Sequence, residues 1–418
     1  MRFPLFSWLF AAVALAGSPL RAAESVPPAP SASPAPWVAT WAAAARDYNQ
    51  PPPIAGIPPP APATLRNQTV RLRVLPAVGG ATVRVRFSNV FGKTPVQIAA
   101  ASVARSTGAD AVSPRDIAPL RFDGRPELML TPGAERWSDA VALSVQPQQP
   151  LAVSFYVADA AQVATVFQAS DAAVWIAAGD ATRAATLTAP GRSDWGHVVT
   201  GVDVARRPAP PVVVAFGDSI TQGTSIEPSL QGGYPARLAQ RLRGPASRDN
   251  APSVVNTGIG GNRLLVDGTG PRALDRFERD VLGQSGVTHT LILIGINDIG
   301  RDVLLPNEAQ PLTALTAGLQ QLVDRARSRG VKVLLGTLTP VKGSGYFNEA
   351  TEAKRQGLNR WIRGRQDIDG VVDFDAALRD RDDPEKLNPA YDSGDHLHPG
   401  AAGFAAMAAA VDVRELKE

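Results

Sequence analysis

The chain has 418 residues and 42 Lys and Arg against 39 Asp and Glu, so its formal net charge at pH 7 is +3. This near balance gives no basic surface for nucleic acid, and we expect no nucleic-acid partner. The chain has no cysteine, which excludes disulfides and cysteine-ligated metal sites. It is also too long for one ordinary domain, so its stability must come from two hydrophobic cores.

The N-terminus has the pattern of a secretory signal. Arg2 precedes an apolar stretch over residues 3–17, and small residues follow it. This stretch is shorter than the roughly twenty apolar residues that span a bilayer. We expect residues 1–23 to be a cleaved signal peptide and residues 24–36 a Pro- and Ala-rich linker. The protein would then be secreted or periplasmic, with no stable membrane insertion after cleavage.

The next part of the chain favours β-structure. Residues 69–74 and 82–87 each alternate apolar with polar side chains, and Gly79-Gly80 between them is typical of a hairpin turn. Residues 151–157 indicate another strand. Many short runs of this kind, separated by turn residues, predict an antiparallel sandwich or jelly roll.

A proline-rich segment, residues 206–211, marks a change in the pattern of the sequence. It reads Arg-Arg-Pro-Ala-Pro-Pro, which is rigid, polar and unfavourable for a helix. We therefore predict a domain boundary here. Residues 37–205 would form the β-sandwich domain, and residues 206–418 would form a second domain.

The second domain alternates apolar runs with amphipathic helical patterns, which predicts a three-layer α/β fold with a doubly wound parallel sheet. The predicted strands cover residues 212–216, 254–256, 291–294, 331–335 and 371–374. The predicted helices have apolar faces within residues 234–242, 274–281, 312–326, 349–365 and 401–411. Gly330 follows the third of these helices and is a candidate C-terminal cap.

Ser219 is the first candidate functional residue. It follows Gly217 and Asp218 after residues 212–216, a β-branched run typical of a parallel strand that is buried on both faces. Open α/β sheets place their sites at the carboxyl ends of the strands. A serine hydroxyl becomes a good nucleophile only beside a base, so this position calls for a histidine.

Of the four histidines, His398 has the most suitable partner. Asp395 lies three residues before it, so one turn of chain can bring the carboxylate to the far ring nitrogen and fix the tautomer. His396 is interpreted as a polar loop residue. The His-x-His pair lacks a third histidine nearby, and we expect no metal. Structural positions are expected for His197 and His289.

Two further residues are candidate hydrogen-bond donors to a developing oxyanion. Asn297 follows residues 291–294, so its amide would emerge at the same sheet edge as Ser219. Gly261 belongs to the glycine-rich segment 258–261, whose bare backbone can bring an N–H close to a substrate, although a plain tight turn is the alternative. The glycine spacing does not fit a dinucleotide fingerprint.

The second half of the chain resembles the SGNH or GDSL family of serine esterases and lipases, over about residues 210–415. In that family four signature blocks carry Ser, Gly, Asn and His in this order. The matching residues are Ser219, Gly261, Asn297 and His398, with Asp395 completing the last block. The first block reads Gly-Asp-Ser-Ile where leucine is usual. The chain has no Gly-x-Ser-x-Gly elbow, which argues against an α/β-hydrolase fold.

This resemblance implies a serine esterase that works through an acyl-enzyme, and the predicted signal peptide implies that it is exported. Ser219 would be the nucleophile, His398 the base and Asp395 its orienting carboxylate. The N–H groups of Ser219 and Gly261 and the amide of Asn297 would form the oxyanion hole. The resemblance implies no cofactor and a small-molecule or glycan ester as partner. Short-chain or acetyl esters are favoured over long lipids, because the sequence near the blocks has no strongly apolar lid segment. A lipase or acyltransferase using other acyl donors, and an inactive carbohydrate-binding protein, are the alternatives.

Some esterases of this family carry an added β domain, and some of these use it to hold a glycan. The polar and aromatic residues of the predicted β-sandwich therefore have either a glycan-binding or a structural role. Four polar residues of this region could face the mouth of the active site. For the two arginines among them, the alternation of the sequence favours the solvated face of a strand instead. They are Arg84, Arg86, Ser88 and Asn89. Three tryptophans either stack on sugars or belong to the core, which is more usual for large aromatics. They are Trp37, Trp41 and Trp175.

Overall fold

The computed structural model describes residues 1, 34–50, 63–168, 172–224, 232–244 and 250–416. The predicted signal peptide, apart from Met1, and the predicted linker up to residue 33 lie outside the described residues. Residues Ala35–Glu418 form one compact unit, and the description below concerns this unit. Within the described ranges, none of the helices combines the length and the apolar character needed to cross a bilayer.

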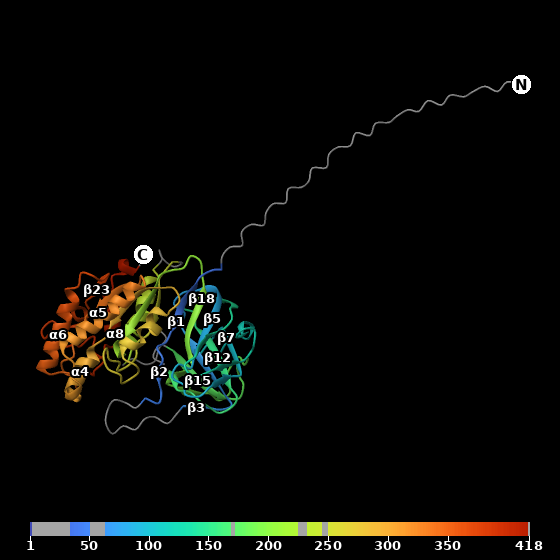
Figure 1. Cartoon of the computed structure of the whole chain (residues 1–418), viewed down its shortest axis with the longest axis horizontal. Helices are drawn as coiled ribbons and strands as arrows, with labels where there is room; N and C mark the ends of the chain where they lie inside the picture. Colours follow the sequence, from blue (N-terminus) through green and yellow to red (C-terminus); the bar gives the residue numbers. More distant parts are fainter. Residues whose placement is uncertain (2–33, 51–62, 169–171, 225–231, 245–249, 417–418) are drawn as a thin grey trace. The chain divides into compact units, whose positions relative to one another are not determined.

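Two antiparallel sheets of the N-terminal half share one core (Figure 1). The first contains β1 (Trp37–Ala42), β18 (Val199–Ala205), β5 (Gly80–Ser88) and β10 (Glu135–Trp137) in this order, and β11 (Val141–Val145) also pairs with β5. The second has the order β16 (Gly191–Ser193), β15 (Ala173–Ala178), β4 (Gln68–Val74), β12 (Leu151–Val157), β7 (Ala100–Arg105) and β8 (Ala118–Pro119). Phe87 of β5 meets Phe155 of β12 with ring centroids 6.0 Å apart, which places these two rings in the core between the sheets.

Smaller sheets complete this half. One contains β17 (Trp195–His197), β14 (Thr165–Gln168) and β2 (Arg46–Asp47). The others pair β13 (Ala161–Gln162) with β3 (Thr64–Leu65), and β6 (Val96–Ile98) with β9 (Leu128–Leu130). A short 3-10 helix, Pro114–Asp116, precedes β8.

The hairpin predicted around Gly79-Gly80 is wrong. β4 pairs with β12 and β15, whereas β5 pairs with β18, so consecutive strands belong to different sheets. A Cβ on Gly79 would lie 2.5 Å from the carbonyl oxygen of Val145, so this glycine allows a close approach to β11. Alternation identifies a strand with one buried face, but it does not identify the partner.

Of the two arginines, Arg86 is buried and Arg84 is half-buried, so they do not form a fully solvated strand face. Arg86 is only 6% exposed, and Arg84 pairs with Asp203 at 2.8 Å and lies over the ring of Trp137. Ser88 and Asn89 are fully buried. For the tryptophans the core interpretation is confirmed at Trp41 and Trp175, which are buried, and Trp37 is half-buried beneath the Arg84 guanidinium.

The C-terminal half contains a parallel sheet with helices on its two faces, and the predicted fold class is confirmed. The strand order is β20 (Ser253–Asn256), β19 (Val212–Gly217), β21 (Val287–Leu293), β22 (Lys332–Gly336) and β23 (Gly370–Val372). The α-helices are α1 (Ser219–Gln222), α2 (Tyr234–Leu242), α3 (Ala273–Phe277), α4 (Ile296–Leu304), α5 (Leu312–Ser328), α6 (Glu349–Arg363), α7 (Phe374–Leu378) and α8 (Ala401–Ala410). A π-helical turn, Glu278–Leu282, continues α3, and 3-10 turns cover Pro306–Glu308 and Val413–Leu416.

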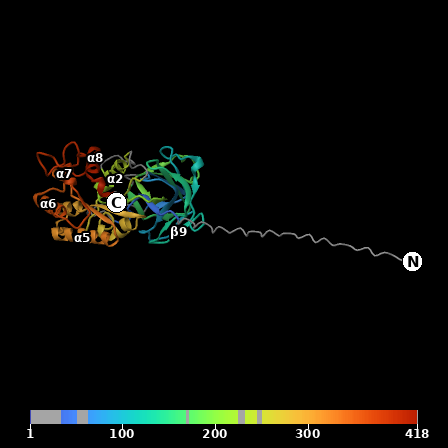
Figure 2. The same ribbon diagram turned by 90° about the horizontal axis from the view of Figure 1, so that it is seen from above.

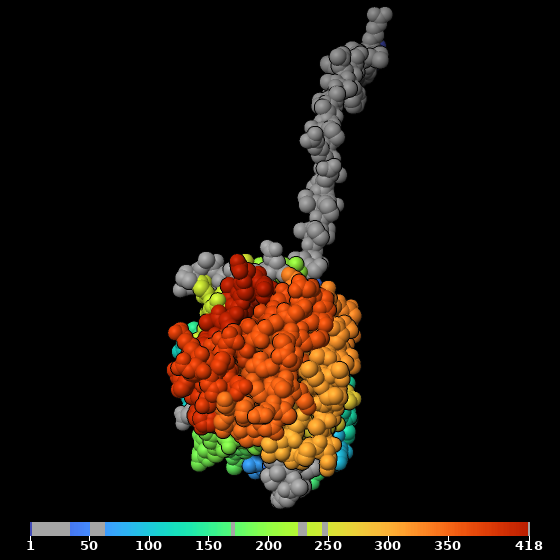
Figure 3. Space-filling model, turned by 90° about the vertical axis from the view of Figure 1, so that its left-hand side faces the viewer, coloured from blue at the N-terminus to red at the C-terminus, as the bar shows by residue number. Residues whose placement is uncertain are grey.

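The helices form two groups. α2 packs against α8 and α8 against α7, whereas α5 packs against α3 and α6 (Figure 2). The orange and red segments, which include α5, α6 and α8, make up the face seen in the space-filling view (Figure 3). Phe374 begins α7 and does not end the preceding strand as predicted, because the Asp373 side chain accepts a hydrogen bond from the Ala376 N–H and caps that helix.

Residues 206–211, where we predicted a domain boundary, lie between β18 and β19. Direct hydrogen bonds join the two halves nearby: the Ala39 N–H donates to the Ser285 carbonyl at 2.9 Å, and the Ser253 hydroxyl donates to the Ala39 carbonyl at 2.6 Å. One cluster of buried apolar side chains includes residues of both halves, so the two hydrophobic cores that we expected are joined into one. The boundary therefore stays a prediction.

Candidate active site

Ser219 lies at a sharp turn between β19 and α1. A Cβ on the preceding Gly217 would lie 2.2 Å from the Leu293 carbonyl oxygen, so only glycine fits between the neighbouring strands. The Asp218 side chain accepts a hydrogen bond from the Ile220 N–H at 3.0 Å and caps α1. These contacts hold the Ser219 side chain at the carboxyl end of a buried strand, where it is 7% exposed.

His398 connects Ser219 to Asp395. Its Nε2 lies 2.8 Å from the Ser219 Oγ, although the two residues are 179 positions apart, and its Nδ1 lies 2.6 Å from the Asp395 Oδ2. The other carboxylate oxygen of Asp395 accepts the N–H groups of Leu397 and His398, so the loop itself fixes this carboxylate. The structure thus brings together the three residues that the sequence predicted for nucleophile, base and orienting carboxylate.

The electrostatics of Asp395 suit an orienting role. Partial burial opposes its ionisation, but hydrogen bonds from the His398 N–H and ring and from the Leu397 N–H outweigh that effect and lower its pKa to about 2. Asp395 is therefore a carboxylate throughout the neutral range. Its Oδ2 accepts a hydrogen bond from the Nδ1–H of His398, which leaves Nε2 as the acceptor for the serine hydroxyl.

The other three histidines have different partners. His396 turns away at a φ of 61° and bonds Asp392, with Nδ1 to Oδ2 at 2.5 Å. His197 is buried, which lowers its pKa to about 4. His289 lies within β21, where its Nδ1 meets the Thr288 hydroxyl at 2.8 Å. Of the four, His398 is the one that reaches Ser219.

Asn297 is the second residue of α4, the helix that follows β21 after a short turn. Its Nδ2 donates to the Asn262 carbonyl at 3.0 Å, and its Oδ1 accepts the hydroxyl of Tyr346 at 2.9 Å. The side chain is 2% exposed. The predicted donor amide is therefore bonded directly to the residue that follows Gly261.

Gly261 has a φ of +73°, a conformation that side chains other than glycine rarely adopt. Its segment packs on the nucleophile turn: the Ile259 N–H donates to the Gly217 carbonyl, and a Cβ on Gly258 would lie 2.9 Å from the Asp218 carbonyl oxygen. The structure thus places the predicted glycine segment beside the Ser219 turn and beside Asn297. We call residues 257–262 the oxyanion loop below.

Arg276 is a residue of the site that the sequence did not reveal. Its fully buried guanidinium donates to the carbonyls of Gly217 and Thr257, both at 2.7 Å, and to the Asn262 Oδ1 at 2.9 Å. Burial lowers its pKa to about 10, so it stays protonated at neutral pH. One cation therefore ties the nucleophile strand to both ends of the oxyanion loop. A single arginine in an amphipathic helical pattern gives no signal of this role.

Two buried carboxyl groups flank the same loop. Burial raises the pKa of Asp218 to about 7, and its Oδ2 finds no hydrogen-bond partner among the described residues. Burial also raises the pKa of Asp298 to about 6, although this side chain accepts the N–H groups of Leu264 and Leu265. Asp298 thereby fastens α4, which carries Asn297, to the chain just beyond the oxyanion loop.

The β region borders this site. The Gln222 side chain at the end of α1 reaches the Gln168 carbonyl of β14, and a small cavity beside the oxyanion loop is lined from both halves. Arg46 also lines this cavity, and its guanidinium lies 4.4 Å from the ring centre of Trp195. Among the residues that the structure describes, there is no cluster of three metal-ligating His, Cys, Asp or Glu side chains.

Comparison with known proteins gives the following similarities. Residues 215–406 match the model of the GDSL-like Lipase/Acylhydrolase family. Similar solved structures include an acetylxylan esterase from Geobacillus stearothermophilus, with 25% identity, a TM-score of 0.40, and coverage of 49% of this chain and 94% of that chain. A GDSL-like lipase from Bacteroides thetaiotaomicron has 21% identity, a TM-score of 0.36, and coverage of 49% and 87%. No curated protein matches the sequence of this chain.

Proposed function

Proceeding from the GDSL-like lipase/acylhydrolase domain that residues 215–406 form, we propose that this carboxylic ester hydrolase works through a covalent acyl-enzyme on Ser219. The observation that carries the proposal is the pair of hydrogen bonds by which His398 joins Ser219 to Asp395. A nucleophile in contact with a base, and a base oriented by a carboxylate, is the arrangement that acyl transfer requires.

In the first half of the proposed reaction the Ser219 Oγ attacks the ester carbonyl carbon while its proton passes to Nε2 of His398. The tetrahedral intermediate collapses when the bond to the alcohol oxygen breaks, and His398 returns the proton to the departing alcohol. In the second half, water attacks the acyl-enzyme with His398 again as base. The acid leaves and Ser219 regains its proton.

Three donors would stabilise the oxyanion: the N–H groups of Ser219 and Gly261 and the Nδ2 of Asn297. One hydrogen of that amide already goes to the Asn262 carbonyl, which leaves the second for the substrate. Because such donors are fixed before the reaction, they need no reorganisation when charge develops. Removing one typically costs about 100- to 1000-fold in kcat.

We further propose short-chain or acetyl esters as substrates, acetylated glycans included, and a secreted or periplasmic location. The cavity beside the oxyanion loop, which Arg46, Gln168 and Gln222 line together with apolar residues, has a volume of about 20 Å³ and leaves no room there for a long acyl chain. The apolar stretch after Arg2 supports export.

The direct test is pre-steady-state kinetics on a series of nitrophenyl esters from acetyl to long-chain. We expect a burst of nitrophenol, labelling by a fluorophosphonate, and loss of both in Ser219→Ala. Ser144→Ala, at an exposed serine of β11, is the control and should keep both. Full activity in Ser219→Ala would remove Ser219 as the nucleophile.

Two further measurements separate the alternatives. Acetate release from acetylated xylan, against hydrolysis of long-chain esters, tests the substrate class. Competition of a sugar or an alcohol with water for the acyl group distinguishes a hydrolase from an acyltransferase. A chain that is folded but not labelled by fluorophosphonate would be a binding protein.

A further inference from the structure

The side-chain amide of Asn297 is held in one orientation by two hydrogen bonds. The Tyr346 hydroxyl donates to Oδ1 at 2.9 Å, and Nδ2 donates to the Asn262 carbonyl at 3.0 Å. An amide oxygen only accepts and its nitrogen only donates, so the two contacts specify the same orientation. If the amide turned by 180°, an acceptor would replace the donor in the proposed oxyanion hole.

The ring of Tyr346 is fixed by close packing on α4. A Cβ on Gly300 would lie 2.0 Å from a ring carbon of Tyr346, so the ring rests directly on the backbone of this helix. Gly300 follows Asn297 by three positions, which puts both on the same side of α4. A glycine inside a helix costs about 1 kcal/mol relative to alanine, and here it makes room for the tyrosine ring.

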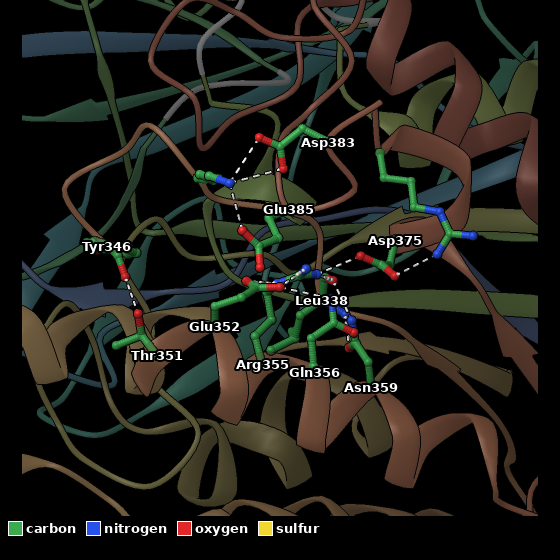
Figure 4. A network of polar contacts seen from close by, with 12 residues as sticks. Leu338, Tyr346, Thr351, Glu352, Arg355, Gln356, Asn359, Asp375, Asp383 and Glu385 are labelled. Carbon is green, nitrogen blue, oxygen red and sulfur yellow. Dashed lines mark hydrogen bonds and ion pairs between the residues drawn. The ribbon is translucent and has the colours of Figure 1, made fainter. Parts of the chain in front are cut away.

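The loop that carries Tyr346, residues 337–348, is anchored to a polar network (Figure 4). At its start, the Leu338 carbonyl accepts hydrogen bonds from Arg355 and Asn359, both at 2.8 Å. Arg355 is itself fully buried and paired with Glu352 and Asp375. The first part of the loop is thereby joined to α6 and α7.

The rest of the loop is held at two more points. The Lys342 ammonium pairs with Asp383 at 3.0 Å and with Glu385 at 2.8 Å. The Thr351 hydroxyl, in the first turn of α6, donates to the Tyr346 carbonyl at 2.9 Å, which fixes the backbone of the tyrosine itself (Figure 4). The position of the Tyr346 hydroxyl is therefore set before any substrate binds.

We propose that Tyr346 is a positioning residue of the oxyanion hole, which keeps the Asn297 amide nitrogen directed at the substrate oxygen. This inference rests on the proposed function, because it concerns the same site. Burial raises the pKa of Tyr346, so its hydroxyl keeps its proton, and remains a donor, throughout the neutral range. The residue acts through Asn297 and therefore affects the transition state more than substrate binding.

The test is a double-mutant cycle on an acetyl ester with Tyr346→Phe, Asn297→Ala and the double variant. We expect Tyr346→Phe to lower kcat at least 10-fold with KM within 2-fold, and to change kcat less than 2-fold in the Asn297→Ala background. Tyr156→Phe is the matched control, because the Tyr156 hydroxyl also donates to an asparagine oxygen, that of Asn67 at 2.8 Å, but on β12. It should leave kcat unchanged.

Two kinetic outcomes would overturn the inference: an unchanged kcat in Tyr346→Phe, or an equal loss in both backgrounds. A measurement independent of activity is the side-chain amide NMR signal of Asn297. It should shift and lose protection from hydrogen exchange in Tyr346→Phe but not in Tyr156→Phe, and an unaltered signal would also overturn the inference. Absence of a burst in the wild-type chain would instead count against the proposed function, and the NMR result would still decide the role of Tyr346.

Discussion

A buried carboxyl group lies next to the nucleophile, and its surroundings favour the protonated form. Asp218 is fully buried and uses one oxygen to cap α1. The environment that raises its pKa to about 7 disfavours the charge that it would carry in water. The capping bond needs only an acceptor oxygen, which an amide supplies equally well.

We therefore predict that Asp218→Asn flattens the dependence of stability on pH. In the wild type the folded state keeps this proton up to about pH 7, whereas the unfolded chain loses it near the ordinary aspartate pKa of 3.8. The folded state thus binds more protons in that window, and the free energy of unfolding falls as pH rises through it. The variant has no carboxyl proton to lose at this position. Its free energy of unfolding should therefore exceed that of the wild type by an amount that grows between pH 4 and pH 7, to the order of a few kcal/mol.

Urea unfolding at several pH values measures this effect, with Asp275→Asn as the control at an exposed carboxylate of α3. The control should keep the slope of the wild type. A variant that loses stability equally at every pH would show that the charge of Asp218 is required in the folded state.

At the scale of elements, the oxyanion loop and α1 touch backbone to backbone. A Cβ on Gly258 would lie 2.4 Å from the Gln222 nitrogen and 2.8 Å from its Cα. The neighbours are main-chain atoms that no rotamer change can move. The position of the loop relative to the nucleophile therefore depends on the absence of one methyl group.

Gly258→Ala should push the oxyanion loop away from α1. We expect kcat/KM to fall at least 10-fold, because the Gly261 N–H moves with the loop, and stability to fall by about 1–3 kcal/mol from overpacking. Steady-state kinetics and thermal unfolding measure the two effects. Gly108→Ala is the control, since a Cβ there meets its nearest neighbour at 3.7 Å. Wild-type kinetics in Gly258→Ala would mean that the loop does not need this contact.

At the scale of the whole molecule, the β region and the parallel sheet share one interior. Their buried apolar side chains belong to a single cluster, and hydrogen bonds join β1 to the chain around β20 and β21. Arg279 adds a further contact, to the Ala45 carbonyl at 3.0 Å. Unfolding of one half would expose the apolar surface of the other.

We predict that calorimetry of the full chain shows one cooperative transition, with equal van't Hoff and calorimetric enthalpies. The transition should coincide whether it is followed by near-UV circular dichroism or by loss of esterase activity. Two separate transitions, or activity that outlasts the first one, would show that the halves unfold independently.

The sequence by itself determined the elements, the fold class and the set of candidate residues. Periodicity reports which side of a strand or helix is buried, and the spacing of Asp395 and His398 places both in one turn. Four short blocks, around Ser219, Gly261, Asn297 and His398, resembled those of a known esterase family and so indicated one site. These are properties of short stretches of chain, so they can be read without knowing how distant stretches meet.

Only the tertiary structure decided which stretches meet. It brings His398 to Ser219 across 179 positions, gives β4 and β5 different partners, and turns Arg276 inward. The hydrogen bond from Tyr346 to Asn297 is likewise a product of two loops brought together by the sheet. Local patterns specify burial but not the identity of the neighbour, because a neighbour depends on the free energy of the whole packed chain.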